Sequence, residues 1–133
     1  MADKVQFELV SPERLLVSRE VEMVVVPGSE GDFGVLPDHA PMISTVRPGV
    51  IEIYEGGNVT DRIFVAGGFA EVTGERCTVL ADEAVAVKDI DRKASEAQLA
   101  TLQNELAALV KDEERARQEA RIEALEAKLA AAA

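Results

Sequence analysis

The sequence predicts an α+β protein. An N-terminal antiparallel β-sandwich is expected over residues 1–87, followed by a C-terminal two-helix antiparallel hairpin over residues 88–133. Glycine and proline punctuate the first part of the chain and then stop, because no proline follows Pro48 and no glycine follows Gly74. From Asp89 onward most residues are Ala, Leu, Glu, Lys, Gln and Arg, which have high helix propensity.

Short apolar runs in the first part alternate in polarity, which is typical of strands with one buried face. Val5, Phe7 and Leu9 point to one side of an extended chain, and the polar residues between them point to the other. Residues 20–26 repeat this pattern, and residues 50–65 predict a hairpin that turns at Gly-Gly-Asn. Many short strands separated by turn residues indicate a sandwich or a barrel.

Two apolar stripes mark the helical part. The first consists of Leu99, Leu102, Leu106 and Leu109, and the second of Ile122, Leu125 and Leu129. The step of 13 residues between the stripes rotates the second by about 140° at roughly 100° per residue. A fold-back near residues 111–115 lets both stripes share one seam, so we predict a hairpin. A single long helix is the alternative if a partner covers the second stripe.

The hairpin is expected to be held weakly. We expect Asp89 or Asp91 to cap the start of its first helix. Seven large apolar side chains must offset the conformational entropy lost by the whole segment, and alanine fills most of the remaining seam. The hairpin is therefore either a mobile arm that undocks without unfolding the sandwich, or a fixed brace.

Charge and composition disfavour several functions. A formal net charge of -11 argues against binding to nucleic acid and against adsorption to an anionic bilayer. The N-terminus lacks a signal-peptide core, and no apolar run approaches the roughly 20 residues of a membrane span. No direct membrane insertion is expected. Cys77 lies in a predicted strand and is expected to be a buried structural thiol.

The stretch over residues 31–42 contains two glycines, two prolines, two acids and the one histidine of the chain, but it forms no recognisable catalytic set. Its glycines match neither the dinucleotide fingerprint nor a phosphate-binding loop. Asp32, Asp38 and His39 are candidate ligands or acid–base groups, but a metal site needs three or four ligands and the chain has one histidine. Ser44 offers no nucleophile elbow. We therefore expect no catalytic residue, metal or cofactor, and a chain that binds or couples.

Three stretches resemble a known family. They are GSEGDFGVLPDHAPMISTVRPGVIEI (residues 28–53), VAGGFAEV (residues 65–72) and CTVLADEAV (residues 77–85). With their LP-x-HAP and GGF-x-EV motifs, in this order and before a helical pair, they are similar to the epsilon subunit of F-type ATP synthases. The resemblance covers the whole chain. It implies a non-catalytic subunit of the central stalk in a proton-driven rotary enzyme.

The resemblance also implies partners. The sandwich would bind the gamma subunit along one side and the ring of membrane rotor subunits, the c subunits, at its base. It would thereby help carry torque from proton flow to the catalytic head. Ring contact is assigned to Glu30, Gly31, Asp32 and His39, and gamma contact to Ser11 and Ser44. The chain would lie peripherally on the cytoplasmic face of the bacterial inner membrane.

The resemblance also implies that the helical pair regulates ATP hydrolysis. Retracted, it packs on the sandwich; extended, it reaches the alpha/beta catalytic head and opposes ATP hydrolysis. The residues expected to face acidic loops of the head are Arg115, Arg117, Arg121 and Lys128.

Some members of the family bind ATP through an I/L-D-x-x-R-A motif where the helices begin. The sequence IDRKAS keeps Ile90 and Asp91, but Ala94 stands where arginine is expected and Ser95 where alanine is expected. We expect weak or absent ATP binding and an altered latch for inhibition.

Two other functions stay open from the residues alone. One is a freestanding β-sandwich interaction module whose tail forms an intermolecular coiled coil. The other is a small hydrolase that uses Asp38 and His39.

Overall fold

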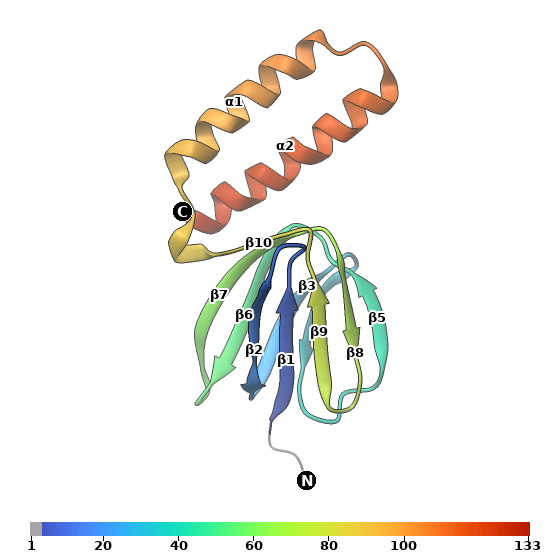
Figure 1. Cartoon of the computed structure of the whole chain (residues 1–133), viewed down its shortest axis with the longest axis vertical. Coiled ribbons are helices and arrows are strands. Elements are labelled where there is room, and N and C mark those ends of the chain that lie inside the picture. Colours follow the sequence, from blue (N-terminus) through green and yellow to red (C-terminus); the bar gives the residue numbers. More distant parts are fainter. Residues whose placement is uncertain (1–3) are drawn as a thin grey trace.

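The computed structural model describes residues 4–133 and shows two packed sheets with a pair of helices at one end (Figure 1). The strands are β1 (Val5–Val10), β2 (Leu15–Val21), β3 (Met23–Gly28), β4 (Gly31–Val35), β5 (Met42–Thr45), β6 (Gly49–Glu55), β7 (Asn58–Ala66), β8 (Phe69–Val72), β9 (Arg76–Leu80) and β10 (Glu83–Ala86). A short 3-10 helix η1 (Val87–Asp89) leads into α1 (Arg92–Ala108) and α2 (Asp112–Ala132). The predicted fold class is confirmed.

The two sheets have the strand orders β2-β1-β9-β8-β5, which we call the β1 sheet, and β10-β7-β6-β3-β4, which we call the β6 sheet. Among the described strands, the pairing of β1 with β9 is parallel and the other pairings are antiparallel. This one parallel pair departs from the purely antiparallel prediction. It arises because β1 is inserted between β2 and β9 and runs in the same direction as β9.

Alternation builds an aliphatic core between the sheets. Val5, Phe7 and Leu9 are fully buried, while the intervening positions of β1 are only half-buried. Phe64 points to the opposite face of β7 from its buried neighbours, yet it is also fully buried. The end of α2 packs on β6 and β7 over this outer face. The hairpin therefore shields part of the outer face of the β6 sheet from solvent.

The run over residues 20–26 forms two strands instead of the single strand that its alternation suggested. β2 ends at Val21 and β3 begins at Met23, and the two strands belong to different sheets. The amide of Glu22 donates to Tyr54 O at 3.2 Å. This crossover was hidden in the sequence because no glycine or proline marks it.

Two glycine pairs shape the turns. Gly56 and Gly57 have φ angles of 60° and 79° and close the predicted hairpin between β6 and β7. A Cβ on Gly68 would lie 1.9 Å from Leu80 O, and its φ is 99°. Gly68 therefore lies where the backbones of β8 and β9 approach too closely for a side chain.

The strand directions divide the loops between two ends of the sandwich. The end that carries the helices, here called the hairpin end, holds the loops at residues 11–14, 29–30 and 46–48 (Figure 1). The opposite end, called the far end, holds the loops at residues 36–41 and 73–75.

The helices form the predicted antiparallel hairpin (Figure 1). Asp91 caps α1, because its carboxylate accepts a hydrogen bond from Ala94 N at 3.0 Å. The chain reverses at residues 109–111, just before the predicted 111–115. Ile122 and Leu125 are buried, so one long helix with an exposed second stripe is not the state adopted here.

Candidate functional site

The residues assigned to ring contact do not form one surface. Glu30, Gly31 and Asp32 lie at the hairpin end, at the turn between β3 and β4. His39 lies at the far end, where Asp38 N donates to Gly74 O at 2.9 Å. The five residues of β4 separate the two groups by roughly 17 Å at about 3.4 Å per residue. They were predicted to make one contact because they lie close together in a stretch of sequence that is rich in glycine and proline.

The turn between β3 and β4, residues 28–32, is a polar exposed tip. Glu30, Gly31 and Asp32 are all exposed. Arg47 fixes the base of the tip, because its guanidinium donates to Asp32 Oδ1 and to Gly28 O, each at 2.5 Å. Among the described ion pairs Glu30 takes no part, so the tip presents one uncompensated carboxylate.

The far-end loop is shaped by backbone hydrogen bonds. Asp38 has a φ of 66°, a left-handed conformation that aspartate tolerates. His39 N donates to Leu36 O at 3.2 Å, and His39 Nδ1 lies 2.7 Å from Ala40 O. In the described part of the chain no hydrogen bond joins Asp38 to His39 and no group of three or more metal-binding side chains is found. The arrangement offers no acid–base pair.

Ser11 and Ser44 lie near opposite edges of the β1 sheet. Ser11 follows β1 and closes a turn, donating from its amide to Arg14 O at 3.0 Å. Ser44 is in β5, opposite Ala70, and its hydroxyl donates to Thr45 O at 2.9 Å. Three strand spacings separate β1 from β5, or roughly 14 Å.

An apolar row crosses the outer face of the β1 sheet next to Ser11, whereas Ser44 faces the inner side with its partner Ala70. The row consists of Leu15, Val10, Leu80 and Phe69, which are paired in register across four strands and end beside Thr45. Leu15 is 55% exposed, Phe69 44% and Leu80 39%. A contiguous apolar patch on an outer sheet face indicates a docking surface.

The sequence prediction missed this apolar row. Phe69 and Leu80 were noticed only as members of strands or motifs. The available signal was that both occupy outward positions, next to the inward Ala70 and Val79, where polar residues are expected. Their alignment across four strands needed the register.

The basic residues of α2 are not equally free. Arg115 Nη1 donates to Leu106 O at 3.0 Å and to Leu109 O at 3.1 Å, which satisfies carbonyls at the end of α1. Lys128 pairs with Glu83 of β10. Arg121 lies 3.5 Å from Gln118 Oε1. Arg117 is exposed and has no partner among the described hydrogen bonds and ion pairs.

Gln118 adds a buried polar link inside the hairpin. Its amide donates to Leu102 O at 3.1 Å and to Glu105 Oε2 at 3.4 Å. Together with Arg115 it ties α2 to α1 through the main chain of α1. This link was not predicted, because glutamine is common on exposed helix faces and nothing in the helical pattern marks Gln118 as buried.

The residues of the partial ATP motif have structural roles. Ile90 ends η1, with its amide donating to Val87 O at 3.3 Å. Asp91 is occupied as the cap of α1. Ser95, at the alanine position of the motif, is buried.

Cys77 is fully buried in β9 opposite Phe7. Burial raises the pKa of its thiol from 9.0 to about 12, because the thiolate is poorly solvated in an apolar core. The predicted structural role is consistent with this environment.

These features define a class: a β-sandwich docking protein with a helical hairpin appended at one end. The family model described as ATP synthase, Delta/Epsilon chain, beta-sandwich domain matches residues 4–87. The ATP synthase epsilon chain of Rhodospirillum rubrum is 62% identical over 106 residues, covering 80% of this chain and 79% of the relative. That of Paramagnetospirillum magneticum is 64% identical over 98 residues, 74% of each chain. The chain belongs to the ATP synthase epsilon-chain family.

Solved structures agree with this assignment. A chain of the Euglena gracilis mitochondrial ATP synthase OSCP/F1/c-ring structure matches with a TM-score of 0.82 and 25% identity, over 98% of this chain and 82% of that chain. A chain of the Tetrahymena thermophila central stalk/c-ring structure has a TM-score of 0.65 at 15% identity, over 98% and 97% of the two chains, and supports the fold. Among the described residues, neither helix is long and apolar enough to cross a membrane.

Proposed function

We propose that this chain is a non-catalytic rotor subunit in the central stalk of an F-type ATP synthase. In this role it links the gamma subunit to the ring of c subunits and couples proton flow to ATP synthesis. Family membership and the similarity to a chain of an F1/c-ring assembly support the role. A peripheral position on the cytoplasmic face of a bacterial inner membrane follows from it.

The gamma subunit docks on the apolar row of the β1 sheet. This is the observation that carries the proposal: Ser11, which the family resemblance assigns to gamma, directly follows Val10 of a row that includes the exposed Phe69 and Leu80, whereas Ser44 faces the inner side of the sheet with Ala70. Burying such side chains against a complementary face supplies the association energy.

The docking proposal is tested by replacing Phe69 with serine and measuring gamma affinity with the full chain. We expect a loss of about tenfold, typical of removing an aromatic contact from an interface. Val59→Ser is the matched control, because Val59 is 38% exposed on β7, away from the row. Equal affinity for the Phe69→Ser variant would contradict docking on this face.

The ring contact is made by the tip at residues 28–32. His39 is excluded from the same contact because it lies at the other end of the sandwich. Cysteines introduced at Glu30 and at His39 distinguish the two ends. Crosslinking to c subunits in assembled enzyme is expected from position 30, and crosslinking from position 39 alone would reverse the assignment.

Residues 88–133 act as a mobile regulatory domain. In the retracted state seen here, only one end of the hairpin meets the sandwich (Figure 1); in an extended state, α2 would oppose ATP hydrolysis in the catalytic head. Arg117 is the basic residue best placed for that contact, since Arg115 and Lys128 have internal partners. Deleting residues 89–133 is expected to raise ATP hydrolysis by the assembled enzyme, and no increase would contradict inhibition.

ATP does not regulate this hairpin. The carboxylate of Asp91 is already used as a helix cap, and Ala94 cannot supply a guanidinium to phosphates. Calorimetric titration with ATP is expected to give no heat of binding. The freestanding coiled-coil alternative is not favoured, because the hairpin buries Ile122 and Leu125 within one chain.

A further inference from the structure

The two long sides of the sandwich differ. On one side backbone hydrogen bonds connect the two sheets, because Ser29 N donates to Thr45 O and Arg47 N donates to Pro27 O, both at 2.9 Å. On the other side β2 ends the β1 sheet and β10 ends the β6 sheet. In the described residues no backbone hydrogen bond joins β2 to β7 or β10. This side keeps free strand edges, which can pair with an added strand.

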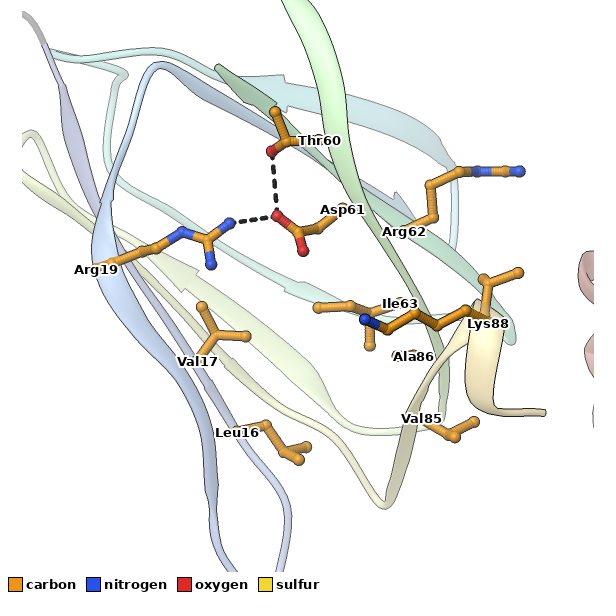
Figure 2. A pocket seen from close by; sticks show the side chains of 11 residues that line it. Leu16, Val17, Arg19, Thr60, Asp61, Arg62, Ile63, Val85, Ala86 and Lys88 are labelled. Carbon is orange, nitrogen blue, oxygen red and sulfur yellow. Dashed lines mark hydrogen bonds and ion pairs between the residues drawn. The ribbon is translucent and has the colours of Figure 1, made fainter.

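A pocket of about 530 Å³ occupies the open side, between β2, β7, β10 and η1 (Figure 2). Leu16, Val17, Ile63 and Val85 provide its apolar lining. Leu16 and Val17 are only partly buried against the core. The pocket thus exposes apolar surface beside unpaired backbone.

The charged groups of the pocket are mostly basic, in a chain with a net charge of -11. Arg19, Arg62 and Lys88 line it, against one acid, Asp61. Asp61 is compensated, since it accepts hydrogen bonds from Arg19 and from Thr60. Partial burial acts to raise the pKa of Asp61, but these hydrogen bonds and the charges of Arg19 and Lys88 outweigh it and lower the pKa.

Lys88 is the cation that remains available. Its ammonium takes part in none of the ion pairs among the described residues. Figure 2 shows its side chain extending across Ile63 toward the middle of the pocket. A carboxylate placed there would meet an ammonium over an apolar surface.

We propose that an extended segment of the gamma subunit, with apolar side chains at alternate positions and an acidic residue opposite Lys88, adds as a strand along β2 and fills this pocket. The inference rests on the proposed docking of gamma. It is supported by the fact that the apolar row and the pocket adjoin each other at β2. Leu15 of β2 belongs to the apolar row, and the next residue, Leu16, lines the pocket. A partner bound to the outer face of the β1 sheet therefore has to extend only around the edge strand β2 to reach the open side.

The test measures gamma affinity and amide hydrogen exchange of the full chain with and without gamma. Lys88→Glu is expected to weaken gamma binding about tenfold, because like charges in a contact cost affinity. Lys93→Glu is the matched control, with the same charge change at an exposed position of α1. In the wild-type complex the amides of residues 15–21 are expected to exchange more slowly than in the free chain.

The outcomes separate the two proposals. If gamma binds and Phe69→Ser weakens it, while Lys88→Glu is neutral and β2 is unprotected, the pocket proposal is wrong and docking on the row stands. If gamma does not bind at all, both fail. If the free chain dimerises in ultracentrifugation and Lys88→Glu abolishes the dimer, the occupant is a second copy, which overturns the gamma segment.

Discussion

Lys128 Nζ lies 2.6 Å from Glu83 Oε2 and joins the end of α2 to β10. Among the described ion pairs it is the one that connects the helices to the sandwich. Lys128 is only 19% exposed, whereas Glu83 is 49% exposed. Such a half-exposed pair contributes about 0.2–1 kcal/mol and weakens with salt.

Glu83→Gln is expected to raise the undocked population of the hairpin by up to about fivefold, in line with the loss of one such pair. Glu96→Gln is the control, because Glu96 pairs with Arg92 within α1 and does not touch the sandwich. Energy transfer between dyes on cysteines introduced at Val59 and Val110 reports the change, since both side chains are exposed. An unchanged transfer efficiency would show that the pair does not hold the hairpin.

The same pair predicts inhibition of different strength when either of its two members is replaced in the assembled enzyme. Glu83→Gln frees the hairpin with Lys128 intact and is expected to lower ATP hydrolysis. Lys128→Gln also frees the hairpin but removes a positive charge, so its inhibition is expected to be weaker than that of Glu83→Gln. Steady-state ATP hydrolysis at low salt measures both variants. Equal hydrolysis by the two would contradict a second role for Lys128.

Arg115→Ala is expected to destabilise the hairpin by about 1.5–3 kcal/mol, the usual value for hydrogen bonds made by a charged donor. The variant leaves the carbonyls of Leu106 and Leu109 without the guanidinium. Arg117→Ala, which removes an exposed arginine from the same helix, should change stability by less than about 0.5 kcal/mol. Helical circular dichroism during urea unfolding compares them, and equal curves would count against the capping role.

Gly68→Ala is expected to prevent folding or to cost several kcal/mol. The new methyl group would overlap Leu80 O, and the backbone has a φ of 99°, which alanine rarely adopts. Gly74→Ala is the control, because no atom lies within 4 Å of a Cβ at that position. The measurement is thermal unfolding. A Gly68→Ala variant as stable as Gly74→Ala would mean that β8 and β9 can separate without cost.

Cys77 makes stability depend on alkaline pH. The folded pKa of about 12 exceeds the ordinary 9.0, so the unfolded chain loses its thiol proton first. Stability is retained below pH 9 and falls between pH 9 and 12, with a slope approaching about 1.4 kcal/mol per pH unit. Cys77→Ala should lack this component in urea titrations across that range. Rapid alkylation of native Cys77 at pH 8 would contradict the buried thiol.

Local patterns in the sequence determined the elements and the division into sandwich and hairpin. The alternation at Val5, Phe7 and Leu9 and the two helical stripes are short-range signals, because a strand repeats every two residues and a helix every 3.6. The Gly-Gly-Asn turn between β6 and β7 was also predicted from its residue types. Motif similarity then supplied the family.

Tertiary structure alone decided which surfaces exist. The ring assignment grouped Asp32 with His39, but the direction of β4 places them at opposite ends of the sandwich. The apolar row, the open side at β2 and the pair of Lys128 with Glu83 all join residues from distant parts of the chain. Such contacts depend on strand order and register, which the periodicity of one strand does not encode, since the same alternation fits many pairings.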